Sequence, residues 1–251
     1  MTELRDAVRE RYAERALEIA TGGSGCCDTG CCDDISDASA CGYTAADLAS
    51  VGFDPKASLG CGNPLLLADL HPGEQILDLG SGMGLDVLLS AKRVSPGGHA
   101  YGVDMTDEML EQAREHQRAA GIANATFLKG TIEEVPLPDA AVDVVISNCV
   151  INLAADKSAV LREAYRVLRP GGRFAVADMV ALHEISPFLK RQLDLWAGCV
   201  AGTITVAAYR DALSTAGFTD VDLEITREIG IEGVTEKIAS AYIRARKPAA
   251  A

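Results

Sequence analysis

The sequence has few basic residues for its acidic content. Lysine and arginine total 23 against 36 aspartates and glutamates, which leaves a formal net charge of −13 over 251 residues. A surface this acidic repels phosphate backbones and anionic lipid headgroups. We therefore expect neither nucleic acid nor a membrane as a partner.

Long hydrophobic runs are also missing. Apolar stretches such as VDVVI and NPLLLADL are far shorter than the roughly 20 residues that cross a bilayer as a helix. The first 20 residues are charged throughout and hold no apolar signal-peptide core. We expect a cytoplasmic protein with one substantial core, or a core domain and a smaller appendage.

Cysteine pairs at the C-x-x-C spacing of zinc sites are absent, although the chain has eight cysteines. In a reducing compartment these are not expected to form structural disulfides. Four of them crowd into CCDTGCC, residues 26–32, a Gly- and Asp-rich stretch that we interpret as a mobile loop or tail, and Cys41 follows. The other three stand singly in LGCGNP (Cys61), SNCVINL (Cys149) and WAGCVAG (Cys199). Each of these three has the alternative interpretation of a small buried hydrophobe.

Strand-like and helical patterns alternate through the middle of the chain. We expect strands at 75–80, 99–104, 125–130, 142–148 and 171–179, the last preceded by an RPGG turn, and helices from Leu85, Asp107 and Ala155. This alternation predicts an α/β fold, a doubly wound and mostly parallel sheet with helices on both faces. Outside it we expect helices at 3–20, 44–53, 186–200 and 206–218, and strands at 219–229 and 240–247.

Three segments follow from these patterns. Residues 1–62 are expected to form an N-terminal helix and a Cys-rich extension, and residues 63–180 the cofactor-binding core. Residues 181–251 are expected to form a smaller C-terminal α+β segment that covers the substrate and adds the final strands.

A glycine-rich loop, DLGSGMGLD, follows the first strand of the core and opens a helix. Glycines let a backbone approach a ligand closely, and a helix N-terminus attracts negative charge. The dinucleotide pattern G-x-G-x-x-G is not met because position 85 is leucine. Asp104 ends the next strand, where a carboxylate can accept hydrogen bonds from both hydroxyls of a ribose.

Residues 75–179 resemble the class I S-adenosylmethionine-dependent methyltransferases, through ILDLGSGMG, YGVDMT, KGTIEEVP, ISN and VLRPGGRF in that order. The resemblance implies a Rossmann-like fold and S-adenosylmethionine as cofactor. It implies that the loop contacts the methionine part of the cofactor, that Asp104 binds the ribose and that Met105 packs on the adenine. The implied cofactor residues are Asp78, Gly80, Ser81, Gly82, Gly84, Asp104, Met105, Thr131, Ile132, Glu133 and Asn148. Two alternatives stay open: Asp78 as a helix cap or loop salt bridge, and Glu133 as an acid at the start of a helix.

The three single cysteines have unusual surroundings. Ligands of open α/β sheets bind beyond the carboxyl ends of the strands, which places Cys149 near the cofactor. A turn presents Cys61 between two glycines, and Cys199 lies in a segment that often covers the site in this fold. Three thiols from distant segments that converge would suit a soft, thiophilic partner better than zinc, which usually takes a fourth ligand.

LGCGNP, SNCVINL and WAGCVAG, with the Cys-rich N-terminal stretch, are similar to the arsenite methyltransferases. The resemblance implies that Cys61, Cys149 and Cys199 bind As(III) as a trithiolate whose lone pair attacks the S-methyl group, so that no general base is needed. It implies arsenite and trivalent methylarsenicals as substrates, and Cys61 as the cysteine needed least for the methylated substrates. It also implies a thiol reductant, thioredoxin or glutathione. A fourth cysteine of the family has two candidate matches, Cys32 and Cys41.

Two other functions remain open. A carbon- or oxygen-methyltransferase of a small organic substrate, such as a quinone precursor, would normally need a nearby base, and the four histidines (His71, His99, His116, His183) all read as surface residues. A metalloid-binding or sensing protein without catalysis is the third hypothesis, which the intact cofactor loop disfavours. CCDTGCC either gathers arsenite or is a reactive tail, and we expect it to be dispensable for the chemical step. Tyr12, Asn152 and Trp196 are candidates either for lining the site or for packing.

Overall fold

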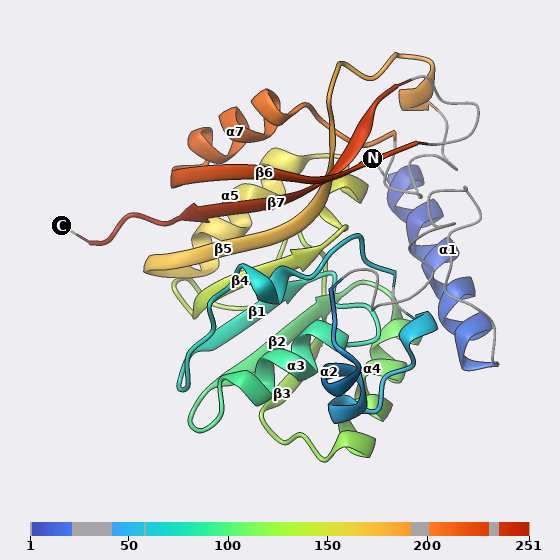
Figure 1. Cartoon of the computed structure of the whole chain (residues 1–251), viewed down its shortest axis with the longest axis vertical. Coiled ribbons are helices and arrows are strands. Elements are labelled where there is room, and N and C mark those ends of the chain that lie inside the picture. The colour runs from blue at the N-terminus through green and yellow to red at the C-terminus, as the bar shows by residue number, and fades with distance from the viewer. Residues whose placement is uncertain (1, 22–41, 58, 192–200, 231–235, 251) are drawn as a thin grey trace.

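The chain folds around one seven-stranded sheet (Figure 1). The computed structural model describes residues 2–21, 42–57, 59–191, 201–230 and 236–250. The strands lie in the order β3-β2-β1-β4-β5-β7-β6, and β7 runs antiparallel to both of its neighbours while β1 to β5 are parallel. Their bounds are β1 Gln75–Leu79, β2 His99–Asp104, β3 Ala125–Lys129, β4 Val142–Asn148, β5 Leu168–Ala181, β6 Thr219–Ile229 and β7 Ile238–Arg246.

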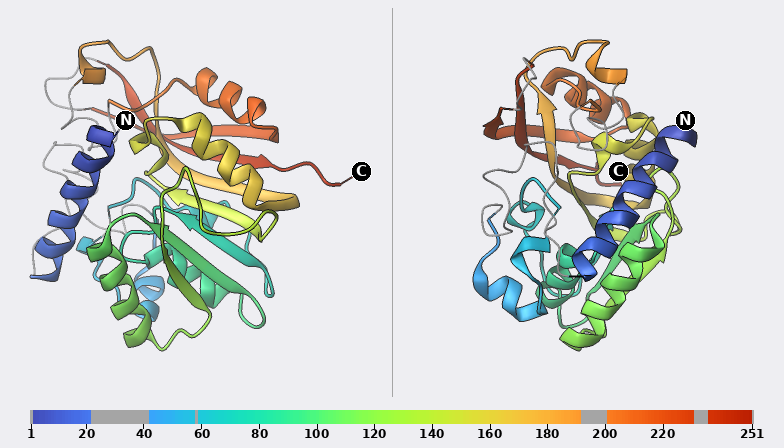
Figure 2. Two further views of the ribbon diagram at one scale, coloured as in Figure 1. Left: turned by 180° about the vertical axis from the view of Figure 1, so that it is seen from behind. Right: turned by 90° about the vertical axis from the view of Figure 1, so that its right-hand side faces the viewer.

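Helices cover both faces of the sheet (Figures 1 and 2). One apolar core lies between the sheet and α2, α3 and α4, and a second core lies between the sheet and α5 and α7. Helix α1 packs against α4 rather than on the sheet. The helices are α1 Thr2–Ala20, α2 Ala45–Val51, α3 Leu85–Arg93, α4 Asp107–Ala120, α5 Lys157–Val167 and α7 Val206–Thr215, with 3-10 turns η1 Pro55–Ala57, η2 Pro64–Leu66, η3 Ile151–Leu153 and η4 Leu189–Arg191.

The central strands are apolar on both sides, which is why their sequence reads as continuous apolar runs. In β1, Ile76 packs into the core under α3 while Leu77 and Leu79 pack into the core under α5. In β4, Ile146 packs into the core under α3 and Val145 into the core under α5. The predicted doubly wound, mostly parallel sheet is therefore confirmed.

Most element bounds agree with the sequence-based expectation, and the differences have local causes. Helix α2 begins as predicted, because Thr44 and Asp47 form a capping box. Helix α5 starts at Lys157 instead of Ala155 because the Asp156 carboxylate accepts a hydrogen bond from the Ala159 N–H at 3.0 Å.

The RPGG stretch belongs to a strand and is not a separate turn. Strand β5 already begins at Leu168, which pairs with Val142 of β4. The register then shifts, so that Val144 pairs with Arg173, and the residues between Leu168 and Arg173 form an irregular part of the strand. Strand β5 is thereby longer at both ends than predicted.

Several predictions concern residues outside the described ranges. CCDTGCC, Cys41, Trp196 and Cys199 all fall there, as does most of the helix expected at 186–200, of which the described part contains only η4. The final strands β6 and β7 join the main sheet, and the division at residues 62 and 180 stays a prediction.

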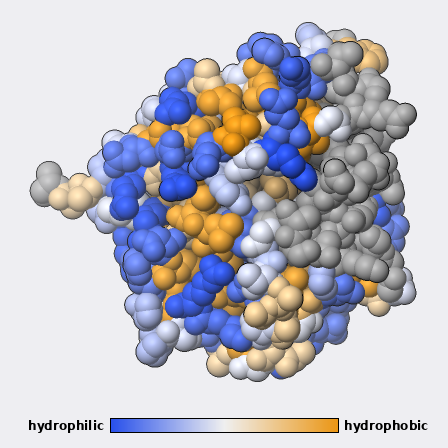
Figure 3. All heavy atoms as spheres, viewed as in Figure 1, coloured by the Kyte–Doolittle hydropathy of each residue, from blue (hydrophilic) through white to orange (hydrophobic). Residues whose placement is uncertain are grey.

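The surface of the described residues mixes polar and apolar side chains. Figure 3 shows hydrophilic residues interleaved with smaller hydrophobic patches on the face of Figure 1. None of the helices in the described ranges has both the length and the apolar character that a bilayer-spanning segment needs.

Candidate active site

A cavity of about 330 Å³ lies at the carboxyl ends of β1, β2 and β4. The strand ends contribute Asp78, Asp104 and Asn148, and the glycine-rich loop lies between them. Helix α1 closes one side through Leu4, Val8 and Tyr12, so the N-terminal helix is part of the cavity wall. This is the edge of the sheet at which open α/β folds bind their ligands.

The glycine-rich loop needs glycine for its backbone conformation and for its packing. Gly80, Gly82 and Gly84 have φ angles of +70°, +49° and +88°, in the left-handed region that favours glycine. A Cβ on Gly80 would lie 2.4 Å from Val150 Cγ1, and one on Gly84 would lie 2.7 Å from Phe127 Cζ. Helix α3 begins immediately after this loop, so its N-terminal N–H groups face the cavity edge, where they attract a carboxylate.

Asp104 is fixed in place by the backbone. Its Oδ2 accepts a hydrogen bond from the Gly82 N–H and its Oδ1 one from the Thr106 N–H, both at 2.9 Å. A carboxylate has about four lone-pair sites, so each oxygen keeps the capacity to bind one hydroxyl of a ribose. Burial raises the pKa of Asp104, against the opposing effect of hydrogen bonds from Thr106, Gly82 and Met105.

Asp78 is a buried strand residue and neither a helix cap nor a salt-bridge partner within the described residues. Its side chain is 3% exposed and lines the cavity, and its Oδ1 has no hydrogen-bond partner there, as is also true of Ser81 Oγ. Burial, and then the nearby carboxylates of Asp86 and Asp104, raise the pKa of Asp78 well above its usual range. Unsatisfied buried polar atoms at a cavity wall call for a polar, cationic partner. The amino-acid part of S-adenosylmethionine fits this requirement.

The predicted adenine side is a tight turn. Met105, Thr131, Ile132 and Glu133 line the cavity, as the resemblance implies. Thr131 pairs with Glu134 in an isolated β-bridge, so Glu133 lies within a turn and the alternative of a helix start is wrong.

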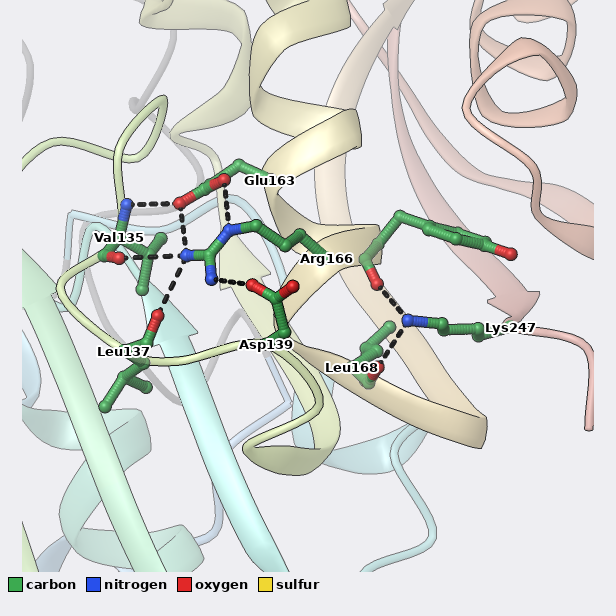
Figure 4. A network of polar contacts seen from close by, with 8 residues as sticks. Val135, Leu137, Asp139, Glu163, Arg166, Leu168 and Lys247 are labelled. Carbon is green, nitrogen blue, oxygen red and sulfur yellow. Dashed lines mark hydrogen bonds and ion pairs between the residues drawn. The ribbon is translucent and has the colours of Figure 1, made fainter. Parts of the chain in front are cut away.

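An arginine of α5 holds the loop that follows this turn (Figure 4). Arg166 donates hydrogen bonds to the carbonyls of Val135 and Leu137 at 3.1 and 2.9 Å and forms ion pairs with Glu163 and Asp139. Glu163 in turn accepts a hydrogen bond from the Val135 N–H at 2.7 Å. The cavity wall at this turn is thus attached to α5, whose apolar side packs into the second core.

Two of the three predicted thiols lie in the described part of the chain, and one of them, Cys149, lines the cavity. Cys149 directly follows β4, is 6% exposed and has a φ of +62°, which costs strain in a non-glycine residue. Its N–H donates a hydrogen bond to the Ala177 carbonyl at 2.8 Å. Cys61 is half-buried and packs against the apolar cluster formed by Cys149, Met179 and two isoleucines. The third thiol, Cys199, lies outside the described residues, and within them no three His, Cys, Asp or Glu side chains gather as metal ligands.

The histidines do not reach the cavity, although two are less exposed than predicted. His71 and His183 are exposed, in agreement with the sequence analysis. His99 and His116 are half-buried: a His99 ring nitrogen lies 2.9 Å from Thr126 Oγ1, and a His116 ring nitrogen lies 3.0 Å from the Met83 carbonyl. None of the four is among the described residues that line the cavity.

Of the remaining candidates, Tyr12 lines the cavity and Asn152 does not. Asn152 is buried and donates a hydrogen bond to Asp178 Oδ1 at 2.8 Å. Burial raises the pKa of Asp178 to about 7, so the buried carboxyl beside Met179 is partly neutral near neutral pH. Asn152 therefore has a packing role, since its side-chain amide is bonded to β5.

Two site residues had no role in the sequence analysis, namely Tyr43 and Asp86. The Tyr43 hydroxyl donates a hydrogen bond to Asp86 Oδ1 at 2.7 Å, and both side chains line the cavity. Burial raises the pKa of Asp86 to about 6, although hydrogen bonds from Tyr43 and Asn148 oppose the shift. A carboxylate in the otherwise apolar run LDVLLSA was the one available signal for Asp86. No comparable signal marks Tyr43.

Comparison with known proteins gives consistent matches. A family model described as a methyltransferase domain matches residues 70–217. An arsenite methyltransferase of Halobacterium salinarum is 43% identical, over 98% of this chain and 67% of its own length. An arsenite methyltransferase of Aquipseudomonas alcaligenes is 39% identical, over 72% of this chain and 55% of its own length. The crystal structure of an arsenic(III) S-adenosylmethionine methyltransferase from Chlamydomonas reinhardtii superposes with a TM-score of 0.71 at 34% identity, covering 82% of this chain and 75% of that one.

Proposed function

The chain belongs to the arsenite methyltransferases, a family of S-adenosylmethionine-dependent methyltransferases, and from this membership we propose that it methylates As(III) held by the thiolates of Cys61, Cys149 and Cys199. The products are methylated arsenicals, and the physiological role is arsenic detoxification in the cytoplasm. The observation that supports the proposal most is the packing of Cys61, from a segment far away in the sequence, against the apolar cluster that contains Cys149, a residue of the cavity wall.

The cavity residues bind and orient the cofactor. S-adenosylmethionine supplies an electrophilic methyl group on a positively charged sulfur. With the cofactor bound, Asp104 would accept hydrogen bonds from the ribose hydroxyls, and the loop from Gly80 to Gly84, with Ser81, would hold the methionine part. Asp78 would provide a carboxylate for the cationic end, while Met105 and the turn at 131–133 would hold the adenine.

The cysteines bind and orient the arsenic. Each As–S bond that forms from As(OH)₃ and a thiol releases one water, which takes up the thiol proton. The lone pair of As(III) then forms an As–C bond to the methyl carbon as the C–S bond breaks, and the departing sulfur keeps that electron pair. The arsenic is formally oxidised by two electrons, which a thiol reductant such as thioredoxin or glutathione restores.

This chemistry needs positioning more than it needs acid–base catalysis. The nucleophile is a lone pair that carries no proton, so the step needs no general base. Cys149 lines the cavity close to the glycine-rich loop: the side chain of the next residue, Val150, packs directly over Gly80 of that loop.

The test is methyl transfer from radiolabelled S-adenosylmethionine in the presence of a thiol reductant. We expect label in methylated arsenicals when arsenite is the acceptor, and none when a small hydroquinone replaces it. Transfer to the hydroquinone without transfer to arsenite would establish the organic-substrate alternative. Arsenite binding without transfer to either acceptor would establish a metalloid-binding protein.

A further inference from the structure

Close packing explains why glycines flank Cys61. A Cβ on Gly60 would lie 2.3 Å from Asn148 Nδ2, and a Cβ on Gly62 would lie 2.9 Å from Ala177 Cβ. Side chains at these positions would push the loop away from the end of β4 and from Ala177 of β5. The short distance between this loop and Asn148 is therefore built into the sequence around Cys61.

Asn148 binds the Cys61 loop at two adjacent points. The Cys61 N–H donates a hydrogen bond to Asn148 Oδ1 at 3.0 Å, and Asn148 Nδ2 donates one to the Gly62 carbonyl at 2.7 Å. Asn148 is the last residue of β4, and Cys149 follows it directly. One side chain thus fixes the backbone of Cys61 relative to the backbone of Cys149.

Tyr43 and Asp86 determine which way the Asn148 amide points. Asn148 Nδ2 donates a hydrogen bond to the Tyr43 hydroxyl at 3.1 Å and lies 3.3 Å from Asp86 Oδ2. A carboxylate only accepts hydrogen bonds, so it selects the NH₂ end of the amide and leaves Oδ1 for the Cys61 N–H. Tyr43 and Asp86 are 2% and 6% exposed, which makes an unpaired polar atom here costly.

This network also reaches the cofactor side. Asp86 is the second residue of α3, which begins where the glycine-rich loop ends. Asp86 therefore connects α3 to Asn148, and Asn148 in turn binds the loop that carries Cys61.

We infer that Asn148, oriented by Tyr43 and Asp86, is a positioning residue that holds Cys61 against Cys149 for arsenite binding, an inference that rests on the proposed function. This role differs from the cofactor contact that the family resemblance implies for Asn148. Both ends of its amide are already bonded within the protein.

The role predicts a selective effect on substrates. Arsenite takes three sulfur ligands, whereas a monomethylated arsenical has one bond occupied by carbon and takes two. If Cys149 and Cys199 suffice for the methylated substrate, misplacing Cys61 should impair arsenite methylation alone. A residue that contacted the cofactor would instead affect both substrates equally.

The experiment measures kcat and KM for arsenite and for methylarsenite in Asn148→Ala and Tyr43→Phe, with the dissociation constant of S-adenosylmethionine from calorimetry. Loss of the two hydrogen bonds to the Cys61 loop should lower kcat/KM for arsenite about tenfold to a hundredfold. Methylarsenite turnover and cofactor affinity should change far less, so that the ratio of kcat/KM for arsenite to kcat/KM for methylarsenite falls about tenfold or more. Tyr43→Phe should also lower the ratio of kcat/KM for arsenite to kcat/KM for methylarsenite, by a smaller factor. If Asn148→Ala does not fold, this second variant tests the inference on its own.

Two further variants separate the possible outcomes. Asn124→Ala removes side-chain hydrogen bonds to Ala91 and Gly98, away from the cavity, and should leave the ratio of the two substrates unchanged. Cys61→Ser should lose arsenite turnover selectively. If it does and the Asn148 and Tyr43 variants do not, the inference fails while the proposed function stands. Normal arsenite turnover in Cys61→Ser would overturn both, and equal losses on both substrates with weaker cofactor binding would make Asn148 a cofactor contact.

Discussion

Cys149→Ser should reduce arsenite methylation by at least about a hundredfold, a loss of ~2.7 kcal/mol in transition-state stabilisation. The substitution replaces a soft thiolate by a hydroxyl that is hard and not ionised at neutral pH. Arsenite would then lose one of its ligands at the strand end beside the cofactor, where its lone pair must point at the methyl group. Cys199→Ser should have an effect of the same size. The measurement is single-turnover methyl transfer at saturating arsenite.

The fold and the cofactor site provide the controls for this prediction. Cys149 is buried in a small apolar cluster, so its serine variant should have a slightly lower thermal unfolding midpoint but stay folded at the assay temperature and keep the cofactor affinity of wild type. Cys61→Ser should lose arsenite turnover but keep methylarsenite turnover, since the methylated substrate needs one thiolate fewer. Wild-type arsenite turnover in Cys149→Ser or Cys199→Ser would refute the three-thiol mechanism and favour a small organic substrate.

Asp104→Ala should weaken S-adenosylmethionine binding by about a hundredfold or more. Two hydrogen bonds from the ribose to a charged acceptor are lost, each worth about 1.5–3 kcal/mol. The Gly82 and Thr106 N–H groups lose their acceptor as well, which loosens the loop. Titration calorimetry of the purified variants measures the effect directly.

Asp107→Ala is the matched control, because this neighbouring carboxylate is exposed and forms its ion pair with Lys129 outside the cavity. Its cofactor affinity should equal that of wild type. Burial raises the pKa of Asp104, so wild-type affinity should also fall as the pH is lowered and the carboxylate becomes protonated. An unchanged affinity in Asp104→Ala would show that the ribose is bound elsewhere.

The sequence identified the parts of the site that depend on local pattern. Asp104 and Asn148 end their strands and Asp78 is the penultimate residue of β1, and parallel strands bring such ends together. The glycine-rich loop could be placed for the same reason, since it joins a strand to a helix. Cys61 and Cys149 were singled out by their neighbours, and the structure places both in one cluster.

Contacts between distant segments were not predictable in this way. The Asn148 hydrogen bond to Tyr43 joins residues 105 positions apart, and no periodicity in either segment marks the partner. The half-buried state of His116 depends on Phe53, which approaches from the segment after α2 to a ring-centroid distance of 5.2 Å. Strand β5 likewise begins earlier than predicted because Leu168 pairs with Val142 of β4, a partner that lies in another segment.

Arsenic K-edge X-ray absorption on the arsenite-bound protein tests the three-thiol site most directly. The measurement is best made on a variant in which Cys26, Cys27, Cys31, Cys32 and Cys41 are serine, so that only Cys61, Cys149 and Cys199 remain as thiols. We predict three sulfur neighbours around arsenic and no oxygen in the first shell, with two sulfurs and one oxygen after the further change Cys149→Ser. A first shell of oxygen in the three-cysteine protein, or one that Cys149→Ser does not alter, would contradict the proposed arsenic site.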